Sequence, residues 1–189
     1  ISIFIGLIGS TLLLFLVEYF NNSVKTIEDL EKYGLNILAI IPSIGNSKIR
    51  KKQKSNNKSI ERTLITREDP KSPISEAYRT LRTSIMYSSA SASDSKVIMV
   101  SSPGPGEGKT TTVSNLAITY ANLGKKTVLI DADLRKPVIN KVFDLDKDNG
   151  LTKYIIGDCK ANDIIQHSQI DNLNIVSSGV NPPNPSELL

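Results

Sequence analysis

The stretch KVIMVSSPGPGEGKTTT, residues 96–112, decides the fold. Its apolar start predicts a buried strand over residues 96–102. The chain from Lys109 to Leu123 repeats apolar positions at helical spacing, and Gly124 is a typical residue to end that helix. A glycine-rich turn that joins a strand to a helix directs backbone N–H groups and the positive end of the helix dipole at one point, an arrangement that binds phosphate.

We expect this turn to be a nucleotide-binding P-loop. Its glycines allow the backbone to form an anion nest. Lys109 is expected to reach the β- and γ-phosphates, the Thr110 hydroxyl to hold Mg²⁺, and Thr111 to lie near the α-phosphate. The strict pattern begins with glycine, and this chain has Pro103 at that position. The expected nucleotide-binding residues are Gly104, Pro105, Gly106, Glu107, Gly108, Lys109, Thr110 and Thr111.

A second motif, VLIDADLRKP at residues 128–137, follows one helix later. Asp131 and Asp133 are two residues apart at the end of a predicted strand, so both side chains are expected on the same face. Carboxylates suit Mg²⁺, which takes few protein ligands and keeps several waters. Thr110 is expected to share the metal with both aspartates. Lys109 and the two aspartates are the expected catalytic residues, with Asp133 as a proton acceptor.

Apolar strands and helices alternate along the second half of the chain. Strands are predicted over residues 126–133 and 173–177, and a helix is predicted to begin after Ser72, an N-cap that Pro73 follows. The alternation is typical of an α/β fold, a P-loop NTPase whose mostly parallel sheet is covered by helices on both faces. A further short strand is expected over residues 36–41.

The first third of the chain differs from the rest. Residues 1–20 contain a long uncharged apolar run and end in Tyr19 and Phe20, so we expect a transmembrane helix, clipped because the sequence opens inside the run. Residues 21–67 are rich in lysine and predict a cytoplasmic juxtamembrane segment and basic linker, which is either a solvated spacer or a contact for anionic headgroups. Residues 68–189 are expected to form the P-loop domain, truncated at its C-terminal end.

Composition argues against several other classes. The chain of 189 residues is 39% hydrophobic and 22% charged, which suits one folded domain. The single cysteine and single histidine, Cys159 and His167, are too few for a Cys₄ or Cys₂His₂ zinc site or an internal disulfide. Aromatic residues make up only 5%, and no folded reading element is visible near the basic linker, so no nucleic-acid partner is expected.

The two motifs together resemble those of the bacterial tyrosine kinases, the P-loop kinases that regulate capsular and exopolysaccharide synthesis. Residues 102–110, SPGPGEGKT, are similar to the family's Walker A motif, S-x-x-P-G-E-G-K-[ST]. Asp131, Asp133 and Arg135 are similar to the family's second motif, an apolar run followed by D-x-D-x-R.

Three further segments carry the same resemblance. The family's E-x-x-R-x-x-R motif resembles Glu76, Arg79 and Arg82 on the helix before the P-loop. Residues 179–189, GVNPPNPSELL, are similar to a turn of the family. The apolar helix and the segment EDLEKYGL at residues 28–35 resemble the end of the chain-length regulator that is fused to some of these kinases.

The resemblance implies an autophosphorylating protein-tyrosine kinase that uses ATP and Mg²⁺ and regulates capsular or exopolysaccharide synthesis and chain length. It implies a ring-shaped homo-oligomer in which the helix with Glu76, Arg79 and Arg82 contacts the neighbouring subunit. The implied partners are the polysaccharide synthesis and export machinery and the inner or plasma membrane, with the kinase domain in the cytoplasm. The family's Walker B aspartate and C-terminal tyrosine cluster have no counterpart in the 189 residues, so this piece alone is expected to be weakly active or inactive.

Two other functions stay open. A non-catalytic ATP-binding scaffold of a polysaccharide chain-length regulator would use the same nucleotide-binding residues. A switch ATPase of the chromosome-partitioning type shares the fold, but those proteins carry a signature lysine where this chain has Gly104, and a membrane helix fits them poorly.

Overall fold

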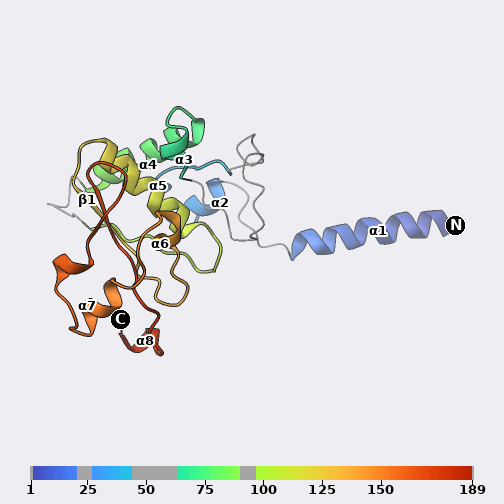
Figure 1. Cartoon of the computed structure of the whole chain (residues 1–189). Helices are drawn as coiled ribbons and strands as arrows, with labels where there is room; N and C mark the ends of the chain where they lie inside the picture. The colour runs from blue at the N-terminus through green and yellow to red at the C-terminus, as the bar shows by residue number, and fades with distance from the viewer. Residues whose placement is uncertain (1, 21–26, 44–63, 90–96, 189) are drawn as a thin grey trace. The chain divides into compact units, whose positions relative to one another are not determined.

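The computed structural model describes four stretches of the chain, residues 2–20, 27–43, 64–89 and 97–188. The chain divides into two units, Ile1–Ile37 and Leu38–Leu189. The smaller unit contains α1 (Ser2–Tyr19) and α2 (Ile27–Glu31), and the larger one contains all the other elements (Figure 1).

Helix α1 carries large apolar side chains that are exposed along its whole length, from Ile3 to Tyr19. Ser10 and Thr11, two of its few polar residues, turn their hydroxyl groups back to donate to carbonyl oxygens of the preceding turn. Within the described residues, no helix combines the length and the apolar content that crossing a bilayer requires. The transmembrane helix expected over residues 1–20 is therefore not confirmed.

The larger unit is built around α5 (Lys109–Asn122) and a three-stranded sheet with strand order β1-β3-β2. The strands are β1 (Thr127–Ile130), β2 (Gln166–His167) and β3 (Leu173–Val176). β1 and β3 are parallel, with Leu129 opposite Ile175, whereas β2 runs antiparallel to β3. α5 packs against β1 and β3, and its apolar side chains form the core with those of the two strands.

The remaining elements of the larger unit are short except for one. They are α3 (Ile65–Glu68), α4 (Pro73–Ser89), α6 (Ile139–Val142), α7 (Leu151–Ile155), the 3₁₀ turn η2 (Ala161–Ile164) and α8 (Pro185–Leu188). α3 and α4 pack against α5 and against each other (Figure 1). The buried core consists of Leu64, Ala117, Ile118, Ala121, Leu129, Ile139, Phe143, Leu173 and Ile175.

The two long helices of this unit begin where their local signals predict. Ser72 caps α4, because its hydroxyl oxygen accepts a hydrogen bond from the backbone N–H of Ser75 at 3.1 Å. α5 begins at Lys109 and ends at Asn122, and Gly124 follows in the left-handed conformation with φ of 80°. Both predictions are confirmed.

The strand predictions are only partly confirmed. β1 and β3 lie within the predicted ranges, but residues 97–102 and 36–41 form no strand. A strand exists only where a neighbour pairs with its backbone, and in the described part of the chain the only pairings are β1 with β3 and β2 with β3. Val97 and Met99 are consequently 88% and 87% exposed.

Two broader expectations also need correction. The sheet is mixed, and β1 is not covered on both faces: Leu129 is buried, whereas Val128 and Ile130 are half-exposed. The folded part also begins before residue 68, since Leu64 and Ile65 at the end of the expected linker are buried against α5. Most of the expected linker, residues 21–26 and 44–63, lies outside the described residues.

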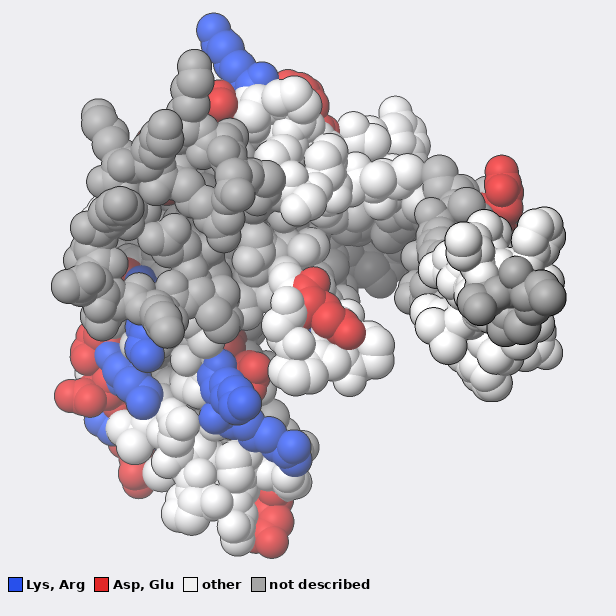
Figure 2. Space-filling view, turned by 90° about the vertical axis from the view of Figure 1, so that its right-hand side faces the viewer, with Lys and Arg blue, Asp and Glu red and all other residues white. Residues whose placement is uncertain are grey.

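Charged side chains of both signs share the surface of the described residues. On the face in Figure 2, lysine and arginine side chains lie interspersed with aspartate and glutamate rather than in a band of one sign.

Two glycines allow α7 to approach the end of β3. The N–H groups of Leu151 and Thr152 donate to the carbonyl oxygens of Ser177 and Ser178 at 2.8 and 2.9 Å. A Cβ atom on Gly150 would lie 2.2 Å from the backbone nitrogen of Gly179, far inside van der Waals contact. The chain can therefore cross here only without a side chain at position 150.

We predict that Gly150→Ala lowers the free energy of unfolding by about 1–3 kcal/mol, because backbone must shift to admit the methyl group. The matched control is Gly9→Ala in α1, where no atom lies within 4 Å of the added Cβ. Urea unfolding followed by circular dichroism measures both variants. Equal stabilities for the two would show that the close approach does not exist.

Candidate functional site

The phosphate-binding turn enters α5 through two glycines with positive φ. Gly106 has φ of 80°, and Gly108, the residue before the helix, has φ of 90° and ψ of 12°. A Cβ atom at either position would meet nothing within 4 Å, so the need for glycine is conformational and not a matter of space. The left-handed turn at Gly108 sets the direction in which the N–H groups of the first turn of α5 point.

The lysine of the turn folds back onto it. Lys109 Nζ donates to Ser102 Oγ at 3.0 Å and to the carbonyl oxygen of Gly104 at 2.9 Å. The Ser102 hydroxyl also donates to the same Gly104 carbonyl oxygen, at 3.0 Å. The ammonium group therefore has two neutral oxygen partners here, which are weaker partners than an anionic phosphate oxygen.

Glu107 closes the other side of the turn. Hydrogen bonds from Ser102 and from the Gly104 backbone, with a smaller effect of the Lys109 charge, lower the pKa of its exposed carboxyl group. A Cβ atom on Gly104 would lie 2.7 Å from Glu107 Oε1, so glycine at position 104 makes room for this contact. The sequence prediction placed Glu107 among the nucleotide-binding residues but did not foresee its contact with Ser102.

Asp131 holds the loop that follows β1. It is buried, and its Oδ2 accepts hydrogen bonds from the N–H groups of Val138 and Ile139, each at 3.1 Å. Its Oδ1 accepts one from the N–H of Asp133 at 3.2 Å. Burial raises the pKa of Asp131, and the three backbone donors partly offset that rise. Both of its carboxylate oxygens therefore organise the backbone between β1 and α6.

Asp133 differs from Asp131 in exposure and partner. β1 ends at Ile130, so neither aspartate lies within the strand as the sequence prediction assumed. Asp133 is exposed, and its Oδ1 accepts a hydrogen bond from the N–H of Lys136 at 2.9 Å. One carboxylate is thus turned into the protein and the other is open to solvent. Arg135, two residues on, donates to Ser186 Oγ of α8 at 2.7 Å.

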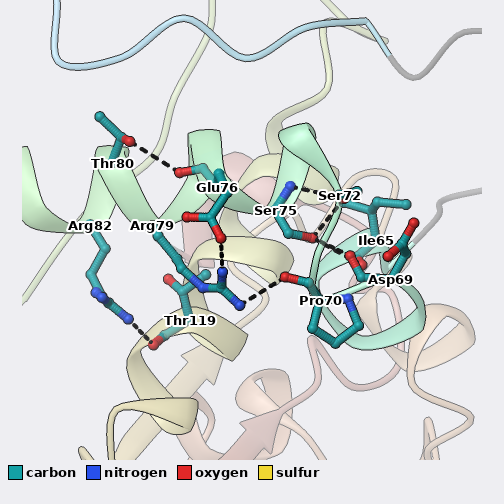
Figure 3. A network of polar contacts seen from close by, with 10 residues as sticks. All are labelled: Ile65, Asp69, Pro70, Ser72, Ser75, Glu76, Arg79, Thr80, Arg82 and Thr119. Carbon is teal, nitrogen blue, oxygen red and sulfur yellow. Dashed lines mark hydrogen bonds and ion pairs between the residues drawn. The ribbon is translucent and has the colours of Figure 1, made fainter.

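The helix with the three charged residues does not present them as one surface stripe. In Figure 3, Arg79 forms an ion pair with Glu76 and also donates to the carbonyl oxygen of Pro70 at 2.8 Å. Arg82 instead turns toward α5, where its NH1 donates to the carbonyl oxygen of Thr119 at 2.7 Å. Glu76 and Arg79 thus belong together on the outer side of α4, and Arg82 belongs to the contact between α4 and α5.

The chain is similar to several proteins that are named tyrosine-protein kinases. The family described as "AAA domain" matches residues 95–184. The tyrosine-protein kinase YwqD of Bacillus subtilis is 42% identical over 137 residues, which are 72% of this chain and 57% of that protein. The tyrosine-protein kinase etk of Escherichia coli K12 is 32% identical over 174 residues, which are 88% of this chain and 24% of that protein.

Solved structures agree with these relatives. The kinase domain of the Escherichia coli tyrosine kinase ETK superposes with a TM-score of 0.76 at 31% identity, over 88% of this chain and 65% of that domain. The chimerical protein CapA2B2 superposes with a TM-score of 0.70 at 38% identity, over 86% of this chain and 64% of the other. The chain belongs to the bacterial tyrosine-kinase family.

Membership of the bacterial tyrosine-kinase family confirms the P-loop NTPase type of α/β fold and implies a nucleotide-binding site. The chain spans only about a quarter to just over half of the length of these two relatives.

The residues of the turn fit a nucleotide's phosphates. The backbone of Gly106 and Gly108 has open space where a side chain would be, and Lys109 supplies a cation whose hydrogen-bond partners are neutral. Fewer side chains are available to bind a divalent cation. Asp131 already accepts three backbone hydrogen bonds, and Asp133 is exposed. Among the described residues no three side chains of histidine, cysteine, aspartate or glutamate form a metal-binding group. Thr110 and Asp133 have the oxygen ligands that Mg²⁺ prefers.

Three residues, one in α5 and two in neighbouring helices, had no place in the sequence prediction of the site. Thr66, Tyr78 and Asn115 are all buried and all make polar contacts next to the P-loop helix. The sequence signal that could have identified them is the presence of polar residues at positions of α5 where an apolar side chain would be expected. That signal indicates a hydrogen-bonded interior group without saying which segment supplies the partner.

We predict that Asp131→Ala lowers the free energy of unfolding by about 1–3 kcal/mol, because it leaves three backbone N–H groups without their acceptor. Asp133→Ala is the control, since it removes an exposed carboxylate with one backbone partner and should cost less than about 1 kcal/mol. Chemical denaturation at neutral pH measures both. Similar losses would contradict the structural role of Asp131.

Proposed function

We propose that the whole protein is an ATP-dependent, autophosphorylating protein-tyrosine kinase that regulates capsular or exopolysaccharide synthesis and chain length. The observation that carries this proposal is the glycine turn at the start of α5, with Lys109 folded over it and hydrogen-bonded to two neutral oxygens. The family's relatives named tyrosine-protein kinases support it.

When bound, Mg·ATP would supply the transferred phosphoryl group and a metal charge that offsets the negative charge of the phosphates. Lys109 would leave Ser102 and Gly104 to pair with the β- and γ-phosphate oxygens, and N–H groups from Gly106 to Thr111 would surround them. Such positioning and charge neutralisation account for most of the catalysis in phosphoryl transfer.

Metal binding and proton acceptance would fall to Thr110 and the two aspartates. Thr110 and Asp133 would hold the metal, with Asp131 beside them as a further candidate ligand that also fixes the loop. Asp133 would accept the proton of the attacking tyrosine hydroxyl. In the same step the tyrosine oxygen would form a bond to the γ-phosphorus, and the bond between that phosphorus and ADP would break. Its exposure leaves it accessible to such a substrate.

We also propose a ring-shaped homo-oligomer at the inner or plasma membrane, with the kinase domain in the cytoplasm and the polysaccharide synthesis and export machinery as partner. Glu76 and Arg79 on the outer side of α4 would contact a neighbouring subunit. Residues 1–20 would attach the protein to the membrane, which the exposed apolar side chains of α1 support.

We predict that Lys109→Met weakens ATP binding by at least about tenfold, because the charge that pairs with the phosphates is lost. Isothermal titration of the full-length protein with Mg·ATP measures the affinity, and phosphotyrosine detection measures the transfer. Lys125→Met is the control, since Lys125 lies in the turn after α5, at its far end from the P-loop. Unchanged ATP affinity in Lys109→Met would refute the site.

The same experiment separates the kinase from a scaffold. Phosphotyrosine that forms in the wild-type protein and disappears in Lys109→Met supports the kinase. Tight ATP binding by the wild-type protein without phosphotyrosine supports a non-catalytic scaffold of a chain-length regulator.

We predict different outcomes for the two arginines of α4. Arg79→Ala should lower the oligomer size in sedimentation experiments and leave the melting temperature nearly unchanged, because its partners are exposed. Arg82→Ala should lower the melting temperature, because it removes a donor to a part-buried carbonyl of α5. An unaltered sedimentation profile for Arg79→Ala would remove the proposed subunit contact.

A further inference from the structure

The first turn of α5, Lys109–Thr112, carries the residues that would bind phosphate, yet its own sequence does little to fix its orientation. It follows a turn whose glycines permit many backbone conformations. Its N-cap is Gly108, which has no side chain that could cap the helix. Apolar packing alone also tolerates small rotations of a helix, because it is not directional. The conformation of Gly108 is therefore not enough to hold this orientation, and groups outside the turn must contribute to it.

Asn115 provides the first such connection. It is completely buried, and its side-chain nitrogen donates to the carbonyl oxygen of Thr111 in the first turn, at 2.9 Å. Its side-chain oxygen accepts two hydrogen bonds from Thr66 of α3, one from the backbone N–H at 3.0 Å and one from the hydroxyl at 2.8 Å. One amide group therefore joins the first turn of α5 to α3.

The α3 end of this connection is itself held firmly. Leu64 and Ile65 beside Thr66 are buried, at 6% and 2% exposure. Figure 3 shows the Ser75 hydroxyl of α4 close to α3, 3.2 Å from the carbonyl oxygen of Ile65 and 2.7 Å from that of Asp69. Thr66 thus lies on a short helix that α4 and the core prevent from moving independently.

Tyr78 of α4 makes a second connection to the same turn. Its ring is buried at 2% exposure, and its hydroxyl group shares a hydrogen bond with the Thr112 side chain. Burial raises the pKa of this tyrosine further above neutral pH, whereas the hydrogen bond with Thr112 lowers it to a smaller extent. Two adjacent residues of the first turn, Thr111 and Thr112, are therefore each tied to a different outside helix.

We propose that Asn115, Thr66 and Tyr78 are positioning residues, which set the orientation of the first turn of α5 and so aim Lys109 and Thr110 at the phosphates. The proposal rests on the proposed nucleotide function of that turn. Its physical basis is that buried hydrogen bonds are directional, so they fix a rotation of the helix that packing leaves free. A misplacement of about 1 Å at a phosphate-binding group is enough to weaken binding and slow transfer.

The test uses two equivalent substitutions in the full-length protein. Thr66→Val removes the hydroxyl that donates to Asn115 and keeps the shape of the side chain. Thr119→Val is the matched control, because Thr119 is equally buried at 3% but its hydroxyl donates only within α5, to the carbonyl oxygen of Leu116. Thr66→Ser keeps the hydroxyl and serves as the rescue variant.

We expect Thr66→Val to weaken Mg·ATP affinity roughly three- to tenfold, the effect of one lost buried hydrogen bond, and Thr66→Ser to restore it. Tyr78→Phe, which removes only the second hydroxyl, should weaken the affinity in the same direction. The melting temperature should fall by a similar amount in both threonine-to-valine variants, but the Mg·ATP affinity should fall only in Thr66→Val. Unchanged affinity in Thr66→Val, or an equal loss in Thr119→Val, would overturn the positioning role.

A second measurement tests the positioning role of Thr66 without any nucleotide, and so independently of the proposed function. Hydrogen exchange on the nucleotide-free protein should be faster at the Thr112 amide, which donates to Gly108 within the first turn, in Thr66→Val than in Thr119→Val. If the wild-type protein binds no ATP, the proposed function fails, and the exchange rates still decide whether Thr66 orders the turn. Identical exchange in the two variants would contradict the inference.

Discussion

The burial of α5 on all sides is the constraint on which the rest of this structure depends. From Ser114 to Thr119 every residue of the helix is buried, with the sheet on one side and α3 and α4 on others. A helix buried this way gains apolar contact on every face but cannot leave its polar side chains to water. Asn115 and Thr119 are satisfied by α3 and by the helix itself, and the Thr119 carbonyl also accepts from Arg82. Asn115 and Thr119 thus find hydrogen-bond partners in this buried environment, whereas the hydroxyl of the equally buried Ser114 has none among the described residues.

Local signals predicted the helices well and the strands poorly, and the reason is physical. A serine cap before Pro73 and a left-handed glycine after Leu123 act on neighbours in sequence, so α4 and α5 begin and end as expected. A strand depends on a partner that can come from anywhere in the chain. Residues 97–102 have the apolar character of a strand, but nothing in that stretch specifies which backbone would pair with it.

Hydrogen-bond partners that lie outside the motifs explain the other differences between the expected and the observed site. The motif around Asp131 correctly marks a special carboxylate, but its partners include Val138 and Ile139, which no motif links to it. The charged residues of α4 show the same limit. A separation of six residues turns a side chain about 120° around a helix from its starting direction. Arg82 therefore cannot share the outward direction of Glu76, and it meets α5 instead.

The P-loop itself balances one positive and one negative charge over a short stretch. Lys109 and Glu107 both contact Ser102 and Gly104, so the lysine lies near a carboxylate whose ionised form the same two residues favour. A phosphate entering the turn must draw the ammonium group from neutral oxygens, which costs less than breaking a full ion pair. It must also approach an exposed glutamate, whose repulsion water screens. The turn can therefore keep its shape without a ligand while its one strong cation stays available, and this availability depends on the first turn of α5 being held from outside the loop.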